Sequence, residues 1–422
     1  MILAKNLLKK TDYDEALKKG VKQFLFNEID FLYEENQENQ FYNCTKTRVQ
    51  STWTTWNENE RVIENFKKKA PQCFSIHGVD LTFAIKKAMF WSNFKTGFLW
   101  YAYQNEFKNS QVYSIDPMHK AGRISTLLKY FKIKSNRHSA EKPMFSHAKS
   151  KRVVHIKNDF QVGLYQFFLK EIKDRSDYSV LVDSKVNKTV LDELGIRSIT
   201  YLKSNTSRFK FPKVNFLQFN HEDWFVFNII LMHWDEICET LNTAYAILEH
   251  QPSVVLINEG ENGIYGAVIS EVMKNNKIMV FNSMNGIKSG EAQDAFINFD
   301  KWFIWDNQMK KLLMDKNHLN EEKLLVVGHL MEDMVKNYKY QNALNIDPKI
   351  LNNKKVISLF SVRGRRFVKL ETLEYLFDLI KQDTSFFLIL RPHPSERKED
   401  YVLPVEQPDN FLFVEYGKHQ VK

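Results

Sequence analysis

The fold class follows from residues 152–183, which read RVVHIKNDFQVGLYQFFLKEIKDRSDYSVLVD. A β-rich run at 152–156 is followed by a loop, a helical run to residue 173 and a second β-rich run at 178–183. Parallel neighbouring strands need a crossover connection between them, and an α-helix usually supplies it. The stretch therefore predicts a β-α-β unit of an α/β protein with a parallel sheet.

The same alternation continues along the chain to residue 328. Further strands are predicted at 198–202, 253–258, 277–281, 301–305 and 323–328, with helices at 187–194, 222–249 and 264–274. Their apolar runs are continuous, as in strands that helices cover on both faces. Strands at 354–362, 385–392 and 410–416, with a helix at 367–382, predict a second unit. We expect one Rossmann-like domain over 151–340 and another over 341–422, the latter short or truncated.

Residues 1–150 lack a strand-and-helix alternation and are predicted to form a mostly helical extension. The aromatic stretch at 90–103 is interpreted as core packing, and His77 as structural. The basic and polar segment 129–152 is either a solvated loop or a surface that meets an anionic lipid or polymer. No strand-loop-helix cradle for a phosphate is recognised here, so we expect the extension to bind the acceptor or a membrane.

The composition is that of a folded globular protein with an anionic partner. Of 422 residues, 43% are hydrophobic and 26% charged, and the 33 Phe and 17 Tyr exclude a disordered chain. The net charge of +9 suits a nucleotide-activated substrate or an anionic surface. No motif for binding nucleic acid and no zinc-ligand spacing is found, so we expect neither partner.

The cysteines and the apolar runs bear on the compartment. Cys44, Cys73 and Cys238 are too few and too far apart for a disulfide scaffold, which favours a reducing environment. The first ten residues are not apolar enough for a signal peptide, and no apolar run is long enough to span a membrane. We expect a cytoplasmic protein, with peripheral attachment at the inner membrane left open.

Two loops of the C-terminal unit are candidates for binding the donor phosphate. Ser361, Arg363, Gly364 and Arg365 follow a predicted strand, and arginine side chains match phosphate oxygens in pairs. The next strand ends in LILRPHPSE at 388–396. The alternative for the first loop is a basic surface turn.

The segment LILRPHPSE contributes Arg391 and His393 to the same predicted site. The prolines on both sides of His393 restrict the backbone, so the imidazole is held on a stiff support. Such a support is useful where one ring nitrogen must meet one ligand atom. A proline-rich turn that caps the strand is the alternative.

Carboxylates follow two strands of the first predicted sheet. Asp159 comes after the strand at 152–156, and Glu259 and Glu261 come after the strand at 253–258. Ligands of open α/β sheets bind beyond the carboxyl ends of the strands, so each acid is a candidate general base. The alternative is that Glu259 and Glu261 only stabilise the positive end of the following helix.

Polar residues after the next strand complete the predicted site. Asn282, Asn285 and Lys288 lie within FNSMNGIKSGE at 281–291 and are candidates for contacting the acceptor. No metal ligands and no cofactor are expected.

The chain resembles the GT-B glycosyltransferases of bacterial surface polysaccharides over residues 151–422. The resemblance is carried by VGHLMED at 327–333 and by the His-Pro segment LILRPHPSE. It implies two Rossmann-like domains with an active-site cleft between them. It also implies that His393 takes part in catalysis by contacting the phosphate of a cytidine nucleotide donor, with Arg391 nearby.

The resemblance implies a metal-independent transferase. The enzyme would move an acidic sugar, such as Kdo or a sialic-acid-like nonulosonate, from a CMP donor to a capsule-type or lipid-linked acceptor. Three alternatives remain open: a CDP-glycerol-type polyol-phosphate transferase, a nucleotide-sugar epimerase on the same scaffold, and a non-enzymatic protein that binds polysaccharide or nucleic acid. The donor sugar, the linkage and the stereochemistry are not determined by the sequence.

Overall fold

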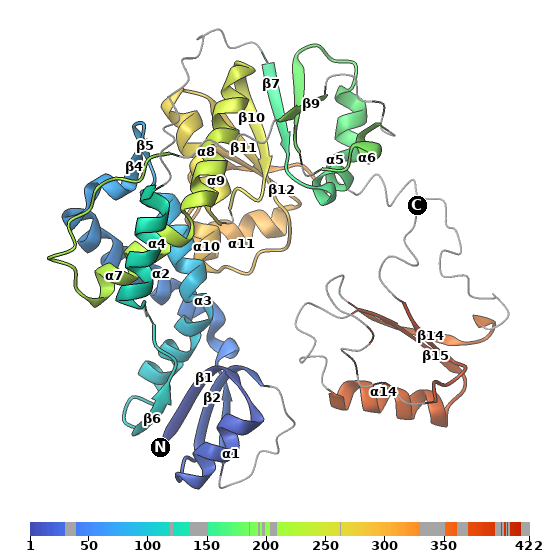
Figure 1. Ribbon diagram of the computed structural model, residues 1–422. Coiled ribbons are helices and arrows are strands. Elements are labelled where there is room, and N and C mark those ends of the chain that lie inside the picture. The colour runs from blue at the N-terminus through green and yellow to red at the C-terminus, as the bar shows by residue number, and fades with distance from the viewer. Residues whose placement is uncertain are drawn as a thin grey trace. The chain divides into compact units, whose positions relative to one another are not determined.

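The computed structural model describes most of the chain (Figure 1). The residues described are 1–29, 39–118, 121–135, 151–184, 186–192, 195, 199–202, 209–261, 263–329, 351–360, 370–392, 398, 401, 403 and 406–414. The chain divides into two compact units, one of residues 1–27 and 34–336 and one of residues 28–33 and 337–422.

A seven-stranded sheet is the centre of the first unit (Figure 1). Its strands are β7 (Lys151–Ile156), β8 (Tyr178–Asp183), β9 (Ile199–Leu202), β10 (Pro252–Asn258), β11 (Met279–Ser283), β12 (Lys301–Ile304) and β13 (Leu324–Val326). They lie in the order β13-β12-β11-β10-β7-β8-β9, and all neighbours are parallel. The predicted α/β class with a parallel sheet is confirmed, as is each strand expected between residues 152 and 328.

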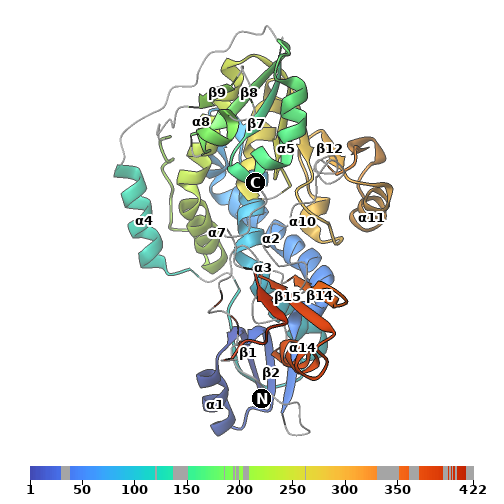
Figure 2. The same ribbon diagram turned by 90° about the vertical axis from the view of Figure 1, so that its right-hand side faces the viewer.

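Helices cover both faces of this sheet, and in Figure 2 α5 and α8 lie on opposite sides of β7 and β8. The helices of this part are α5 (Asp159–Ile172), α6 (Lys188–Asp192), α7 (His221–Met232), α8 (Trp234–Glu249), α9 (Gly263–Asn275), α10 (Ala292–Ala295) and α11 (Asn307–Asn317), with the 3-10 turn η3 (Glu321–Lys323). Val153 and Val154 of β7 are both buried, yet they belong to different apolar clusters. Successive side chains of a strand point to opposite faces, so the continuous apolar run in the sequence reflects burial on two sides.

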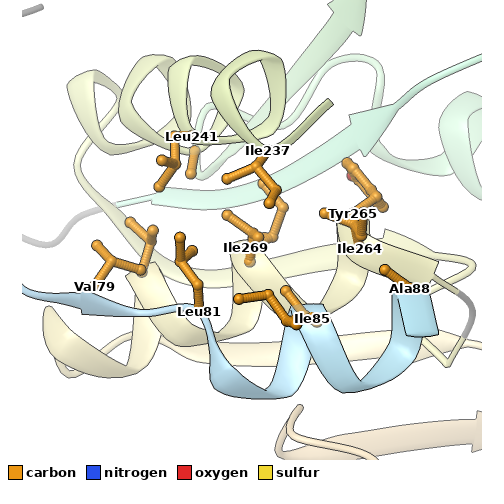
Figure 3. Close-up of a cluster of buried hydrophobic side chains, with 14 of the residues drawn as sticks. Val79, Leu81, Ile85, Ala88, Ile237, Leu241, Ile264, Tyr265 and Ile269 are labelled. Atoms are coloured by element: carbon orange, nitrogen blue, oxygen red, sulfur yellow. The ribbon is translucent and has the colours of Figure 1, made fainter. Parts of the chain in front are cut away.

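The larger apolar cluster also contains side chains from the N-terminal part of the chain. Helices α2 (Arg48–Lys69) and α3 (Thr82–Glu106) contribute to it. Figure 3 shows Leu81 and Ile85, at the start of α3, facing Ile269 of α9, with Leu241 of α8 beyond. The segment predicted as an extension therefore shares one hydrophobic core with the helices that cover the sheet.

Polar caps determine where two of the helices begin. The side chain of Asn158 accepts a hydrogen bond from the backbone N–H of Gln161 and so caps α5. Asn220 and Asp223 form a reciprocal capping box at the start of α7. Such caps stabilise a helix by about 1 kcal/mol each. The cap at Asn158 also fixes the path of the chain as it leaves β7.

A second parallel arrangement lies in the N-terminal part and was not predicted. The strands are β1 (Ile2–Leu8), β2 (Gln23–Ile29), β3 (Gln40–Asn43) and β6 (Val112–Ile115), in the order β3-β2-β1-β6, with α1 (Lys10–Lys18) between β1 and β2. The expectation that residues 1–150 lack strand-and-helix alternation is wrong for this segment. Lys5 and Asn6 interrupt the apolar run of β1, and Asn6 is accommodated because its backbone N–H donates to Asp116 over 2.7 Å and its side chain accepts from Asn27.

The remaining elements of this part are shorter. They are the hairpin of β4 (Ser75–Ile76) and β5 (Val79–Asp80), the 3-10 turns η1 (Cys44–Thr47) and η2 (Pro71–Phe74), and helix α4 (Arg123–Ser135). Cys44, Cys73 and Cys238 are buried free thiols. Among the described residues, no helix combines the length and the apolar character needed to cross a membrane.

The second unit contains a three-stranded sheet. Strands β14 (Lys355–Phe360), β15 (Phe386–Arg391) and β16 (Phe411–Phe413) lie in that order and are parallel, and helix α14 (Leu370–Gln382) connects the first two. The predicted strands and helix of this unit are confirmed. Phe377 and Ile380 of α14 pack with Leu388 and Leu390 of β15 in its core.

Candidate active site

The strand order of the large sheet reverses between β7 and β10, which are neighbours. From β7 the chain proceeds outward through β8 and β9, and from β10 it proceeds the other way through β11, β12 and β13. Ligands of open parallel sheets bind beyond the carboxyl ends of the strands at such a switch point. The residues there are 157–159 after β7 and 259–261 after β10. These two segments form the candidate active site.

Glu259 is the first residue after β10. Its side chain is partly exposed, and its backbone has a φ of 65°, which is uncommon for a residue other than glycine. Burial raises the pKa of the Glu259 carboxyl group above its ordinary value, and the positive charge of Lys157 partly opposes this rise. A partly exposed carboxylate with a raised pKa is suited to accept a proton from a hydroxyl group.

Lys157 provides the positive charge on the β7 side of the switch point. Its Nζ lies 4.6 Å from the centroid of the Tyr265 ring, and the Tyr265 hydroxyl is hydrogen-bonded to Nδ1 of His155. Burial lowers the pKa of His155 to about 3, so this imidazole is neutral at physiological pH. His155 and Tyr265 therefore support Lys157 without adding a charge of their own.

Two glycines allow the turn after β10 to pack closely. The N–H of Gly260 donates to Oδ1 of Asn282 over 2.7 Å, and a Cβ added at Gly260 would lie 2.7 Å from the same oxygen. A Cβ added at Gly266 of α9 would lie 2.3 Å from the Cα and O atoms of Gly260. The turn that carries Glu259 is thus held against the first turns of α9.

Substitution of Gly266 tests this packing. We expect Gly266→Ala to lower the free energy of unfolding by about 1–3 kcal/mol, because the added methyl group meets backbone atoms that cannot rotate away. Gly163→Ala is the matched control, since Gly163 also lies in a helix but has no atom within 4 Å of the added Cβ. The control should be unchanged or up to about 1 kcal/mol more stable. Urea denaturation measures both, and equal changes would contradict the close packing.

Glu261 is the centre of a buried polar cluster beside this turn. The residue is 0% exposed, and its carboxylate accepts hydrogen bonds from Nδ2 of Asn282 over 2.7 Å and from Nζ of Lys288 over 2.6 Å. Lys288 also donates to Oδ1 of Asn285 over 3.2 Å and lies 3.9 Å from Oδ1 of Asp294. Burial raises the pKa of Asp294 to about 6. The charges in this cluster compensate one another inside the protein.

Lys87 brings helix α3 into the same cluster. Its Nζ donates to the backbone carbonyls of Glu261 and Gln293, each over 2.7 Å. The residue is fully buried, and desolvation lowers its pKa to about 7, while Asp294 and Glu261 oppose this shift. Lys87 therefore connects the N-terminal helices to the turn after β10.

A second ion pair secures the same region from helix α2. Arg48 contacts the buried Glu291 twice, with Nε–Oε1 at 2.7 Å and Nη2–Oε2 at 3.1 Å. Ser289 and Gln293 donate to the same carboxylate. The loop between β11 and β12, which contains Lys288, is thus anchored at two points to the N-terminal helices.

The predicted site residues of the first unit have different environments. Glu259 is partly exposed at the switch point, whereas Glu261, Asn282 and Lys288 are buried and bonded to one another. Asn285 is partly exposed. The structure brings these five residues together, although they were predicted from two separate loops.

Asp159 lies on the β7 side in the first turn of α5. It is exposed, and its Oδ1 accepts a hydrogen bond from the backbone N–H of Asn187 over 2.7 Å. This contact holds the segment that leads into α6. Asp159 therefore has a structural task that the sequence did not indicate.

Most of the predicted donor-phosphate residues lie outside the described part of the chain. These are Ser361, Arg363, Gly364, Arg365 and His393. Arg391 is described: it is the last residue of β15, is exposed, and lies in register with Phe360 at the end of β14. It is therefore at the carboxyl edge of the second sheet, as expected.

Sequence reasoning missed residues of the site that come from distant segments. Lys157, Lys87 and Arg48 were not proposed, and neither were Glu291 and Asp294. Only Lys87 carried a detectable signal, because a charged residue four positions after Phe83 and three before Phe90 lies on the apolar face of its helix.

No protein-family model matches this chain, and no curated protein matches it. Solved structures with low sequence identity do resemble it. One, described as a UDP-N-acetylglucosamine 2-epimerase from Listeria monocytogenes, has 12% identity and a TM-score of 0.44 over 64% of this chain and 69% of that chain.

Two more structures belong to the same set. The UDP-GlcNAc 2-epimerase from Neisseria meningitidis bound to UDP-GlcNAc has 16% identity and a TM-score of 0.41, covering 64% of this chain and 73% of its own. The wall teichoic acid polymerase TagF has 13% identity and a TM-score of 0.33, covering 65% and 66%. These TM-scores are below 0.5, so the fold of this chain is defined by its own strand order.

Proposed function

We propose that this chain is a glycosyltransferase that uses a nucleotide-activated sugar. The observation that carries the proposal is the position of Glu259 beside Lys157, at the switch point of a Rossmann-ordered sheet. In the proposed reaction the acceptor hydroxyl oxygen bonds to the anomeric carbon of the donor. The bond from that carbon to the donor phosphate breaks, the nucleotide leaves with the electron pair, and the proton passes to Glu259.

Glu259 suits the role of base better than the other two acids. Glu261 is fully buried and both of its oxygens are engaged, and Asp159 holds the backbone of Asn187. Glu259 is partly exposed, has a raised pKa and lies in a turn that Gly260 and Gly266 hold in place. We propose that Asn285, which is also partly exposed, contacts the acceptor, while Asn282 and Lys288 shape the site through Glu261.

We propose that the second unit holds the donor phosphate. Arg391 is exposed at the carboxyl edge of a parallel sheet, where loops and helix N-termini favour anions. Its neighbour His393 belongs to the His-Pro segment whose resemblance implies contact with a nucleotide phosphate. Charge-assisted hydrogen bonds from such donors stabilise the negative charge that develops on the leaving phosphate.

The finer proposal is a cytidine nucleotide carrying an acidic sugar, transferred to an acidic or lipid-linked glycan. It is supported by the resemblance of LILRPHPSE to the His-Pro segment of such transferases and by the net charge of +9. Positive charge favours association with an anionic donor and an anionic acceptor.

A thermal-shift screen of the full chain with CMP, CDP, UDP and GDP tests the proposal. A nucleotide that binds only the folded state stabilises it, by about 2.7 kcal/mol at a concentration of 100 times its Kd. We expect the largest shift with CMP or CDP, and Arg391→Ala should reduce it at least tenfold in apparent affinity. Lys355→Ala is the control, because Lys355 is a cation at the opposite, amino end of β14 in the same sheet.

The other outcomes separate the alternatives. A shift with UDP alone would replace the cytidine proposal by a uridine-dependent activity such as epimerisation. No shift with any nucleotide would overturn the assignment as a nucleotide-sugar enzyme and favour a binding protein.

A further inference from the structure

Helix α4 has two apolar sides, and only one of them is packed against the protein. Its inner side contains Tyr130, which is buried and contacts Phe216 and Phe227 at centroid distances of 5.1 and 5.7 Å. Lys129 donates to Oδ1 of Asn228 on α7 over 2.9 Å. These contacts fix α4 against α7 and determine which side faces outward.

The outer side of α4 carries a stripe of large apolar residues. Ile124, Leu128 and Phe131 are 77%, 66% and 59% exposed. Their spacing of four and then three residues places them on one face of the helix. Met232 of α7 is also largely exposed, and its Sδ accepts a hydrogen bond from Asn228, the residue that Lys129 contacts. The apolar surface thus continues beyond the helix.

Cations flank this stripe on both sides. With about 100° of rotation per residue, Lys132 lies to one side of the stripe, and Arg123 and Lys134 lie to the other. The helix sequence RISTLLKYFKIKS contains no Asp or Glu. An apolar stripe between rows of Lys and Arg is the pattern of helices that lie in the interface of an anionic bilayer.

We infer that the outer face of α4 binds an anionic membrane surface. Ile124, Leu128 and Phe131 would enter the boundary between headgroups and acyl chains, and the flanking cations would meet the lipid phosphates. A second copy of the chain fits this face less well, because a two-fold contact would bring the same cations of both copies together. The inference does not depend on the proposed glycosyl transfer.

Co-sedimentation with vesicles tests the inference on the full chain. We expect binding to vesicles of phosphatidylcholine with phosphatidylglycerol, and at least tenfold weaker binding to phosphatidylcholine alone. The triple variant Ile124→Ser, Leu128→Ser, Phe131→Ser should bind the anionic vesicles at least tenfold more weakly. Phe160→Ser is the matched control, since Phe160 of α5 is exposed to the same degree, at 61%, and should leave binding unchanged.

A second variant separates charge from apolar contact. Arg123→Gln, Lys132→Gln, Lys134→Gln should remove most of the preference for the anionic vesicles while leaving the apolar stripe intact. Its thermal melt should match that of the wild type, because these side chains are exposed.

Three results would overturn the inference. The wild type could fail to bind the anionic vesicles, or both triple variants could bind them as the wild type does. In the third, the apolar triple variant loses self-association in sedimentation velocity while its vesicle binding is unchanged, which would assign the stripe to a contact between copies of the chain.

Discussion

Glu259→Gln is expected to lower turnover by about 100- to 10,000-fold while leaving nucleotide binding and folding nearly unchanged. A general base typically contributes this factor, and an amide of the same size cannot accept the proton. Turnover is measured with the nucleotide sugar whose nucleotide gives the largest thermal shift, as the release of that nucleotide.

The pH dependence provides a second measurement on the same variant. Burial raises the pKa of Glu259, so its carboxyl group takes up a proton at a higher pH than an exposed glutamate does. Turnover of the wild type should therefore fall as the pH is lowered through this raised pKa, because the base must be ionised. The residual turnover of Glu259→Gln should lack this decrease.

Glu271→Gln is the matched control for Glu259→Gln. Glu271 of α9 is also a partly exposed glutamate whose pKa burial raises, but it does not follow a strand of the sheet at the switch point. Its turnover should stay within about twofold of the wild type. If Glu271→Gln and Glu259→Gln lost activity equally, the assignment of the base to Glu259 would fail.

Lys288→Met is expected to lower the free energy of unfolding by about 3–5 kcal/mol. The substitution removes the Nζ that lies 2.6 Å from the carboxylate of Glu261, which is fully buried. Removing one partner of a buried pair leaves an uncompensated charge inside the protein. Urea denaturation at pH 7 measures the loss.

Two comparisons identify the cause of that loss. Lys310→Met removes a pair of nearly the same length, 2.7 Å to Glu321, which lies at the surface and should cost under about 1 kcal/mol. The double variant Glu261→Gln, Lys288→Met should be more stable than Lys288→Met alone, because the buried charge is gone. Equal losses in Lys288→Met and Lys310→Met would show that burial of this pair has no special weight.

The large sheet could be predicted because its strands announce themselves locally. Each strand of β7 to β13 is a short apolar run between helical segments, and burial on both faces requires such a run. β1 was missed for the opposite reason. Lys5 and Asn6 lie in its centre, and the partners that accommodate Asn6, at Asp116 and Asn27, are distant in sequence.

The site was predicted in part, since the sequence shows which residues follow which strand. It placed Glu259, Glu261 and Asn282 at strand ends, and the structure has them there. It did not show that Glu261 is buried or that Lys87 and Lys157 complete the site. Those features depend on contacts across the sheet and from helix α3.

The sequence by itself determined the α/β class, the parallel strands and the loops in which polar residues follow them. These properties depend on neighbouring residues along the chain, because a strand or a helix is specified by its local apolar pattern. Only the tertiary structure decided which of the predicted acids is accessible. Glu259 and Glu261 are two positions apart and chemically identical, but the first is partly exposed and the second meets Lys288 and Asn282 in the interior. Burial and charge partners come from segments distant in sequence, and these determine the protonation of a carboxyl group and hence its chemistry.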